Sequence, residues 1–272
     1  MDRRYRSLMD MIVCVKQIPD PETPATAVKV DEVAKRVLPA QGVAPVISPF
    51  DAQAVEAALR IRDAQGGGKI TVISAGPDPA RDVIKHSLAM GAAEGVLIDD
   101  PALLDADSFV WAHVLAAAIR KIGTFDIIFC GRQAADWDMG VVGAGLSELL
   151  NVPAVTITKS AVAVDGHLRV ERILLDGFET VEVQTPCVVT VSNELGDPRY
   201  PQLRQIMMAA RKQVTVWKAA DLGLGPDDLR SPMRVERLYI PAKESNVELI
   251  EGDSAEQQAQ NLARRLREVK II

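Results

Sequence analysis

The sequence holds few cysteines and histidines and no excess of positive charge, and each shortage excludes a class of protein. Three cysteines in 272 residues do not make a disulfide framework. Because each lies in an apolar, strand-like run, we expect reduced core thiols at Cys14, Cys130 and Cys187. The three histidines are widely spaced, which supports neither a metal site nor a histidine-assisted nucleophile. The net charge of −6 argues against nucleic acid as a partner, because a phosphate backbone requires a basic surface.

Long apolar runs are missing as well. No run approaches the roughly 18 apolar residues that a membrane-spanning helix requires, so we expect no membrane span. The apolar run at 11–15 is too short for the apolar region of a signal peptide. Residues 1–10 are therefore predicted to be a disordered extension, and a cytoplasmic location is the default expectation.

The chain instead shows a regular alternation of short apolar runs and longer helical patterns. Strand-like runs occur at 12–16, 70–74, 95–98, 126–130 and 154–157, and helical patterns at about 50–65, 79–91, 105–122 and 139–150. Buried strands that alternate with helices form parallel sheets covered on both faces. We therefore predict an α/β fold, an open and mostly parallel sheet with helices on both faces, over residues 11–212.

Two additions to this sheet are predicted. Residues 25–39 form a hairpin-like excursion after the first strand, and 156–185 form an antiparallel ribbon, because Asp165-Gly166 and Asp176-Gly177 interrupt alternating apolar and polar residues. Residues 213–272 are broken by prolines and close with a charged helix at about 254–269. So long a segment with one helix is either disordered or wraps a partner, and its apolar residues favour a C-terminal arm that wraps a partner.

The strongest site signal is the segment 131–143, which follows an apolar strand and opens a helix. Ligands of open parallel sheets bind beyond the carboxyl ends of strands, and the N–H groups of a helix N-terminus attract phosphate. Gly140 and Gly143 would let a ligand approach closely, and Asp136 or Asp138 would cap the helix. The alternative is a plain strand–helix turn, since no established phosphate-binding motif is present.

Two other strand ends should face the same crevice. Lys16 could offset phosphate charge there, although a solvated surface lysine is the alternative. Phe50 stands at a helix entrance and either packs into the core or faces a ligand. The predicted nucleotide-binding residues are Val15, Lys16, Ser74, Ala75, Gly76, Gly131, Gln133, Asp136, Met139, Gly140, Val141, Val142 and Gly143.

Residues 192–211 contain no nucleophile, acid/base pair or ligand cluster. The turn Gly196-Asp197-Pro198 leads through Pro201 into a short basic helix. We therefore predict that Leu195 and Tyr200 lie on an exposed loop that contacts another protein.

Together these segments resemble the β subunit of an electron-transfer flavoprotein. The resemblance rests on Val-Cys-Val-Lys-Gln-Ile-Pro-Asp at 13–20 and on the segments 47–59, 89–92, 131–136 and 197–200, in matching order over about residues 11–225. It implies an electron carrier rather than an enzyme, in a heterodimer whose α subunit holds a redox FAD.

The resemblance also implies roles for particular residues. Pro21 and Phe50 would lie closest to the flavin of the α subunit, and the predicted nucleotide site would hold structural AMP or, in the electron-bifurcating branch, a second FAD. Leu195 and Tyr200 would dock onto an acyl-CoA dehydrogenase-type donor, and a quinone-linked oxidoreductase or another protein would accept the electrons.

One departure bears on the nucleotide. Gly140, Val141 and Val142 stand where ordinary members of the family carry polar phosphate ligands, which moves the expectation slightly toward a second FAD. Two other functions stay open from the sequence: a stand-alone adenine-nucleotide sensor or hydrolase on the same scaffold, and a structural subunit with an empty pocket.

Overall fold

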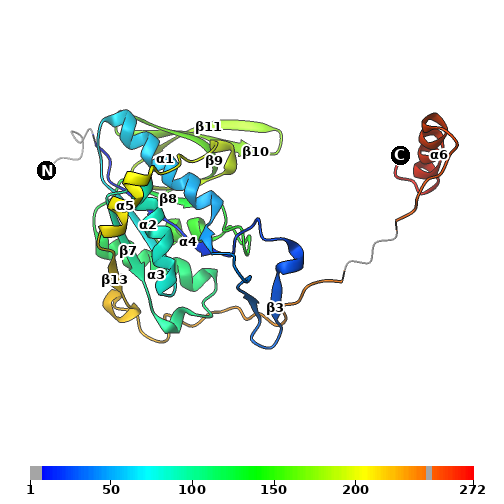
Figure 1. Cartoon of the computed structure of the whole chain (residues 1–272). Helices are drawn as coiled ribbons and strands as arrows, with labels where there is room; N and C mark the ends of the chain where they lie inside the picture. The colour runs from blue at the N-terminus through cyan, green and yellow to red at the C-terminus, as the bar shows by residue number, and fades with distance from the viewer. Residues whose placement is uncertain (1–7, 243–246) are drawn as a thin grey trace.

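The computed structural model describes residues 8–242 and 247–272. Its main feature is a nine-stranded sheet in the order β11-β10-β9-β12-β8-β1-β6-β7-β13 (Figure 1). Seven of its strands run parallel: β1 (Met11–Cys14), β6 (Ile70–Ala75), β7 (Glu94–Ile98), β8 (Ile127–Gly131), β9 (Ala154–Val164), β12 (Cys187–Val191) and β13 (Thr215–Trp217). The predicted α/β fold is confirmed.

Helices cover both faces because successive side chains of a buried strand point to opposite sides. In β1, Met11 and Val13 join the core under one set of helices, whereas Ile12 and Cys14 join the core under the other. The first set contains α1 (Pro49–Gln65), α2 (Arg81–Met90) and α5 (Leu203–Arg211), and the second contains α3 (Ser108–Ile122) and α4 (Val142–Leu150).

The far edge of the sheet is the predicted antiparallel ribbon. β9 (Ala154–Val164) pairs with β12 in parallel, and β10 (His167–Leu174) and β11 (Gly177–Gln184) follow it antiparallel. Asp165 and Gly166 both have positive φ, the geometry that a two-residue hairpin turn requires. The second turn is Leu175-Asp176, one residue earlier than the Asp-Gly pair suggests, since Leu174 pairs with Gly177.

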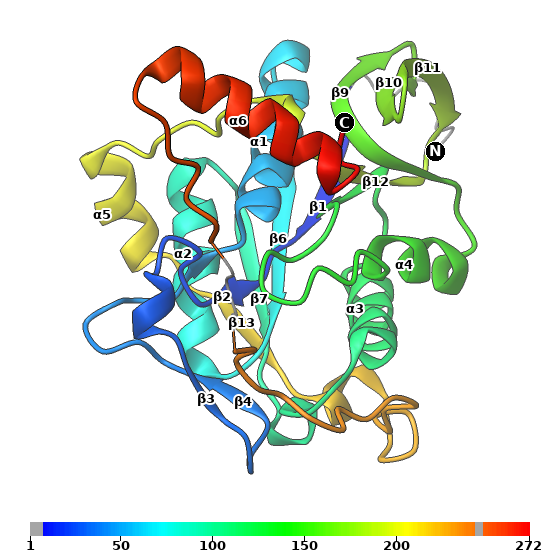
Figure 2. The same cartoon turned by 90° about the vertical axis from the view of Figure 1, so that its right-hand side faces the viewer.

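Two small sheets lie outside the main one. β2 (Gln17–Ile18) pairs with β5 (Val46–Ile47), and β3 (Lys29–Asp31) pairs with β4 (Arg36–Leu38) as the hairpin predicted after the first strand. Figure 2 shows β3 and β4 at the opposite end of the molecule from β10 and β11.

The three cysteines are free and buried, as predicted. No helix among residues 8–242 and 247–272 has the length and apolar character needed to cross a membrane.

The structure corrects the predicted ends of the sheet domain. Met9 is buried, and the main chain of Asp10 bonds to Asp126, so a disordered extension is wrong for these residues; residues 1–7 lie outside the described part. At the other end, β13 pairs with β7 beyond residue 212, and Leu224 and Leu229 pack against the core. The arm therefore begins later than predicted, and its helix α6 (Ala255–Glu268) contains no buried residue.

Candidate functional site

The candidate site lies where the direction of strand order reverses. β1 stands between β8 and β6, so the connections that leave β1 and its neighbours diverge at their carboxyl ends. Such a point opens a crevice in α/β sheets. Lys16, Gly76 and Gly131 follow or end these three strands, and the structure therefore brings the three predicted segments to one edge.

Asp51 joins two of these strand ends. Its Oδ2 accepts a hydrogen bond from the main-chain N–H of Lys16 at 2.8 Å, and its Oδ1 accepts one from the N–H of Gly131 at 2.9 Å. Burial raises the pKa of Asp51 to about 7, against the lowering effect of these hydrogen bonds. The sequence reveals Asp51 only as an acidic residue in a first helical turn, and its role at the site was not predicted.

Position 131 requires a glycine because the junction between α1 and β8 has no room for a side chain. A Cβ at this position would lie 2.4 Å from Asp51 Oδ1 and 2.8 Å from the Cβ of Phe50. A side chain there would separate α1 from β8. The glycine therefore permits the close approach of α1 to the end of the strand.

Lys16 and Asp136 form an ion pair across the crevice. Lys16 Nζ lies 2.6 Å from Asp136 Oδ2, with 39% of the lysine side chain and 18% of the aspartate side chain exposed. Lys16 is therefore not a free surface lysine, and its charge is largely matched by Asp136.

The predicted capping of the helix at 139–150 is wrong. α4 begins at Val142, and no side chain of the described residues caps it. Asp136 is engaged by Lys16, and Asp138 instead accepts a hydrogen bond of 2.8 Å from Gln133 Nε2. The first N–H groups of α4 are thus left without a side-chain cap, a setting in which an anion is stabilised.

Gly143 has a packing role in the structure. Its added Cβ would lie 2.4 Å from Thr190 Cγ2 on β12, so the glycine lets α4 pack closely on the sheet. Gly140, with φ +64, provides the turn that enters the helix. Val15 is buried in the core, which leaves only its main chain to face a ligand, and Val142 is half-buried against the core beneath α3 and α4.

Ser74 presents an unsatisfied polar atom near the end of β6. Its side chain is fully buried, and Oγ has no hydrogen-bond partner among the described residues. Ala75 ends the strand, and Gly76 has φ +157. A buried hydroxyl without a partner costs free energy, so Ser74 is suited to bonding a ligand or a water molecule.

Apolar side chains flank the same loop. Trp137, Met139 and Val141 are each about half exposed. Phe50 is half-buried, and the Arg132 guanidinium lies 5.6 Å from its ring centroid. Pro21 is exposed. The site therefore offers both main-chain polar groups and apolar surface.

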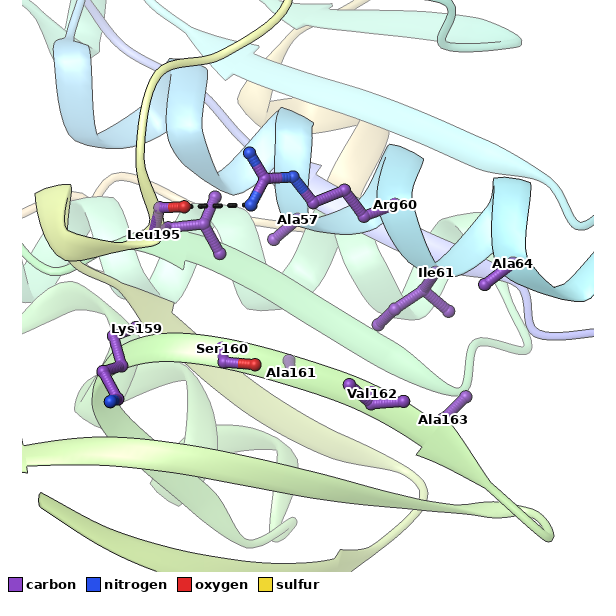
Figure 3. A pocket seen from close by; sticks show the side chains of 10 residues that line it. All are labelled: Ala57, Arg60, Ile61, Ala64, Lys159, Ser160, Ala161, Val162, Ala163 and Leu195. Carbon is purple, nitrogen blue, oxygen red and sulfur yellow. Dashed lines mark hydrogen bonds between the residues drawn. The ribbon is translucent and has the colours of Figure 1, made fainter.

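The first part of the predicted docking loop 192–211, residues 192–200 and called the docking segment below, differs from the prediction in one respect. Tyr200 is 87% exposed, as predicted, but Leu195 is only 8% exposed, so an exposed Leu195 is wrong. Leu195 ends the short helix η5 (Asn193–Leu195), and its carbonyl accepts a hydrogen bond of 2.9 Å from Arg60. Figure 3 shows its side chain beside Ala57 and Arg60, at one end of a cavity of about 280 Å³ between α1 and β9.

Charged side chains of α1 hold this segment. Arg199 Nε lies 2.7 Å from Glu56 and its Nη1 lies 2.7 Å from Asp63. Burial alone would raise the pKa of Glu56, yet hydrogen bonds from Arg199 and Arg60 outweigh it and hold that pKa below its ordinary value. Gln53 adds a contact to the carbonyl of Asn193 at 3.3 Å.

Comparison with known proteins bears on these features. Residues 36–222, more than half of the chain, match the family described as "Electron transfer flavoprotein domain". The chain is 39% identical over 268 residues to the electron transfer flavoprotein subunit beta of Thermoanaerobacterium thermosaccharolyticum, covering 97% of this chain and 100% of the relative.

Two further relatives come from named reductase systems. A subunit of the caffeyl-CoA reductase-Etf complex of Acetobacterium woodii is 36% identical over 267 residues, covering 97% of this chain and all of the relative. The acryloyl-CoA reductase electron transfer subunit gamma of Anaerotignum propionicum is 37% identical over 211 residues, covering 76% of this chain and 77% of the relative. A stand-alone nucleotide sensor or hydrolase is not favoured by these relatives. The chain belongs to the electron transfer flavoprotein family, as a β subunit that carries electrons and is not itself an enzyme.

Proposed function

We propose that this chain forms one half of a heterodimer in which an α subunit holds the redox FAD. This chain then covers that flavin, binds an adenine nucleotide and docks onto an electron-donating dehydrogenase. The names of its relatives, subunit beta and subunit of a reductase-Etf complex, support an assembly of several subunits. We expect it to act in the cytoplasm, where its three free thiols stay reduced.

The observation that carries the nucleotide proposal is the convergence of the ends of β1, β6 and β8 at the switch point of the sheet. The residues present there fit an adenine nucleotide. Ser74 Oγ is buried without a partner among the described residues, and the uncapped N-terminus of α4 offers N–H groups to a phosphate. Gln133 and Gly76 lie on the adjoining loops, where main-chain and amide groups can select adenine.

Between the two nucleotides, we favour a second FAD over AMP. The charge of Lys16 is matched by Asp136, so neither the phosphate of AMP nor the diphosphate of FAD gains much from this cation. Trp137, Met139 and Val141 instead expose apolar surface on which a flavin ring can pack. A bound second FAD would supply an additional redox centre, whereas AMP would serve only structure.

The test is the identity of the nucleotide that the purified chain releases on denaturation. Separation of the supernatant by chromatography with mass detection distinguishes FAD from AMP. Release of about one FAD per chain supports the favoured form, and release of AMP supports the structural form. Denatured protein that releases neither, and native protein that takes up neither when it is supplied, would overturn the nucleotide proposal.

For docking, we propose that residues 192–200 contact an acyl-CoA dehydrogenase-type donor through Leu195 and Tyr200. Because Leu195 is nearly buried, docking through its side chain requires the segment to move away from α1. Leu195→Ala should slow reduction of the flavin by the donor while flavin content stays unchanged, since a central apolar anchor contributes on the order of 1–3 kcal/mol. Unchanged reduction kinetics would contradict this role.

The remaining contacts concern the α subunit and the electron acceptor. Tyr239, Ile240 and Leu249 of the C-terminal arm are exposed apolar residues, and burying such a surface against another chain is favourable. We propose that this arm wraps the α subunit and that Pro21 and Phe50 approach its flavin. The acceptor is proposed to be a quinone-linked or similar oxidoreductase.

A further inference from the structure

The first turn of α1 enters the junction between β1 and β8 at the edge where these strands end. Asp51, on that turn, is 7% exposed. Each of its two carboxylate oxygens accepts one main-chain N–H, from Lys16 at 2.8 Å and from Gly131 at 2.9 Å. One buried side chain therefore links the last residue of β8 to the segment that follows β1.

We propose that Asp51 is a positioning residue of the nucleotide site, which fixes the spacing between Lys16 and Gly131 before a nucleotide binds. This inference rests on the proposed nucleotide site. Lys16 and Gly131 begin the two segments that face the crevice, so their spacing sets the width of the site between β1 and β8. A site held in its binding geometry loses less free energy on binding than one that must be ordered.

The strand ladder does not supply this link by itself. The pairs of β1 with β8 run from Met11 with Ile127 to Val13 with Phe129. Lys16 therefore lies beyond the last of these pairs. The carboxylate of Asp51 replaces the missing strand contact, and hydrogen bonds to a charged acceptor are stronger than those between neutral groups.

Charged and titratable groups surround Asp51 on two further elements. The Lys16 ammonium lowers its pKa and the Asp136 carboxylate raises it, although burial is the dominant effect and brings that pKa to about 7. On the sheet, a hydrogen bond with the Cys14 thiol and burial hold the pKa of Cys130 well above its ordinary value. The negative charge of Asp51 raises that pKa further. The Cys130 thiol therefore stays neutral while Asp51 titrates.

The direction in which Asp51→Asn changes nucleotide affinity distinguishes a positioning role from a simple charge effect. Asp51→Asn removes a negative charge from a site proposed to bind an anion. If charge alone mattered, the variant would bind AMP or FAD more tightly than the wild type. An asparagine offers one acceptor oxygen instead of two, so one strand end loses its tie, and the positioning role predicts weaker binding.

The experiment measures AMP and FAD affinity of the full chain by calorimetry at about pH 8, where Asp51 is mostly ionised. Asp51→Asn is expected to weaken both affinities by about tenfold, the equivalent of one charge-assisted hydrogen bond. The matched control is Asp107→Asn, since Asp107 also bridges two main-chain N–H groups, of Val110 and Met233, both at 3.0 Å. The control should stay within about twofold of the wild type.

Equal or tighter binding by Asp51→Asn would overturn the positioning role while leaving the nucleotide site intact. If the wild type binds neither AMP nor FAD, the nucleotide proposal itself fails, which is a different result. If Asp51→Asn does not fold, a pH titration of the ¹⁵N-labelled wild type, followed at the amide resonances of Lys16 and Gly131, tests the link instead. They should shift together with one midpoint at about pH 7, and separate midpoints or no titration would refute the shared tie.

Discussion

Arg60 donates a hydrogen bond of 2.9 Å to the main-chain carbonyl of Leu195, which holds the docking segment against α1. The same helix carries Asp51 at its N-terminal end and Glu56 beside Arg60. One rigid element therefore contacts both the proposed nucleotide site and the proposed docking segment. This arrangement lets each contact be tested separately along α1.

The first prediction concerns the ion pairs that hold the docking segment against α1. Glu56→Gln removes the charge that pairs with Arg199 and Arg60, and we expect it to lower the free energy of unfolding by about 1–3 kcal/mol. Amide exchange across 193–199 should become faster. Denaturant titration and hydrogen-exchange mass spectrometry measure the two effects.

The control for that prediction is Arg230→Gln. Its ion pair with Asp227 is fully exposed, at 80% and 94% of the two side chains, so stability should change by less than about 0.5 kcal/mol. If Glu56→Gln behaves like the control, the ion pairs do not hold the docking segment.

A second prediction uses opposite changes of the Lys16–Asp136 pair. Lys16→Gln leaves the Asp136 charge unmatched, whereas Asp136→Asn frees the Lys16 ammonium. We expect AMP to bind about fivefold more weakly to the first variant and about fivefold more tightly to the second, the effect of about 1 kcal/mol per exposed charge. Calorimetry measures the AMP affinity of both variants. If both affinities change in the same direction, the phosphate does not lie beside the Lys16–Asp136 pair.

Gly131 provides a steric test of the approach of α1 to β8. Gly131→Ala sets a methyl group 2.4 Å from Asp51 Oδ1 and should destabilise the fold by more than about 2 kcal/mol. Gly225→Ala is the control, because its nearest neighbour would lie 3.7 Å away. Thermal unfolding of the two variants compares them, and equal melting temperatures would show that α1 does not pack closely on this strand end.

The raised pKa of Asp51 gives stability a definite pH dependence. The folded pKa of about 7 exceeds the ordinary value of 3.8, so the folded state binds more protons between these values. The contribution of Asp51 to the free energy of unfolding is greatest below about pH 4. It falls by roughly 1.4 kcal/mol per pH unit as the pH rises toward about 7. The difference in free energy of unfolding between the wild type and Asp51→Asn, measured by denaturant titration, should follow this slope. A difference that does not change with pH would contradict the buried carboxyl.

Much of the fold follows from local patterns. The apolar runs at 70–74 and 126–130 become β6 and β8 within one residue at each end, because burial on both faces demands continuous apolar residues. The Asp165-Gly166 turn is found where predicted, since few residues tolerate its positive φ values. Convergence of the strand ends at one edge follows from parallel order alone.

What the sequence could not reveal depends on contacts between distant residues. Leu195 is buried because Glu56 and Arg60, more than 130 positions away, bind its segment, and no local pattern encodes such pairs. Asp51 resembles an ordinary first-turn acid until β1 and β8 are placed beside it. β13 has only three residues, too few for a periodic signal.

The most direct test of the account is co-expression of this chain with an α subunit of the family, followed by purification of the complex and its absorbance spectrum. We predict a yellow complex with one copy of each chain. On denaturation it should release two adenine nucleotides: the FAD of the α subunit and a second nucleotide from this chain. A colourless, nucleotide-free chain that associates with no α subunit would contradict the account.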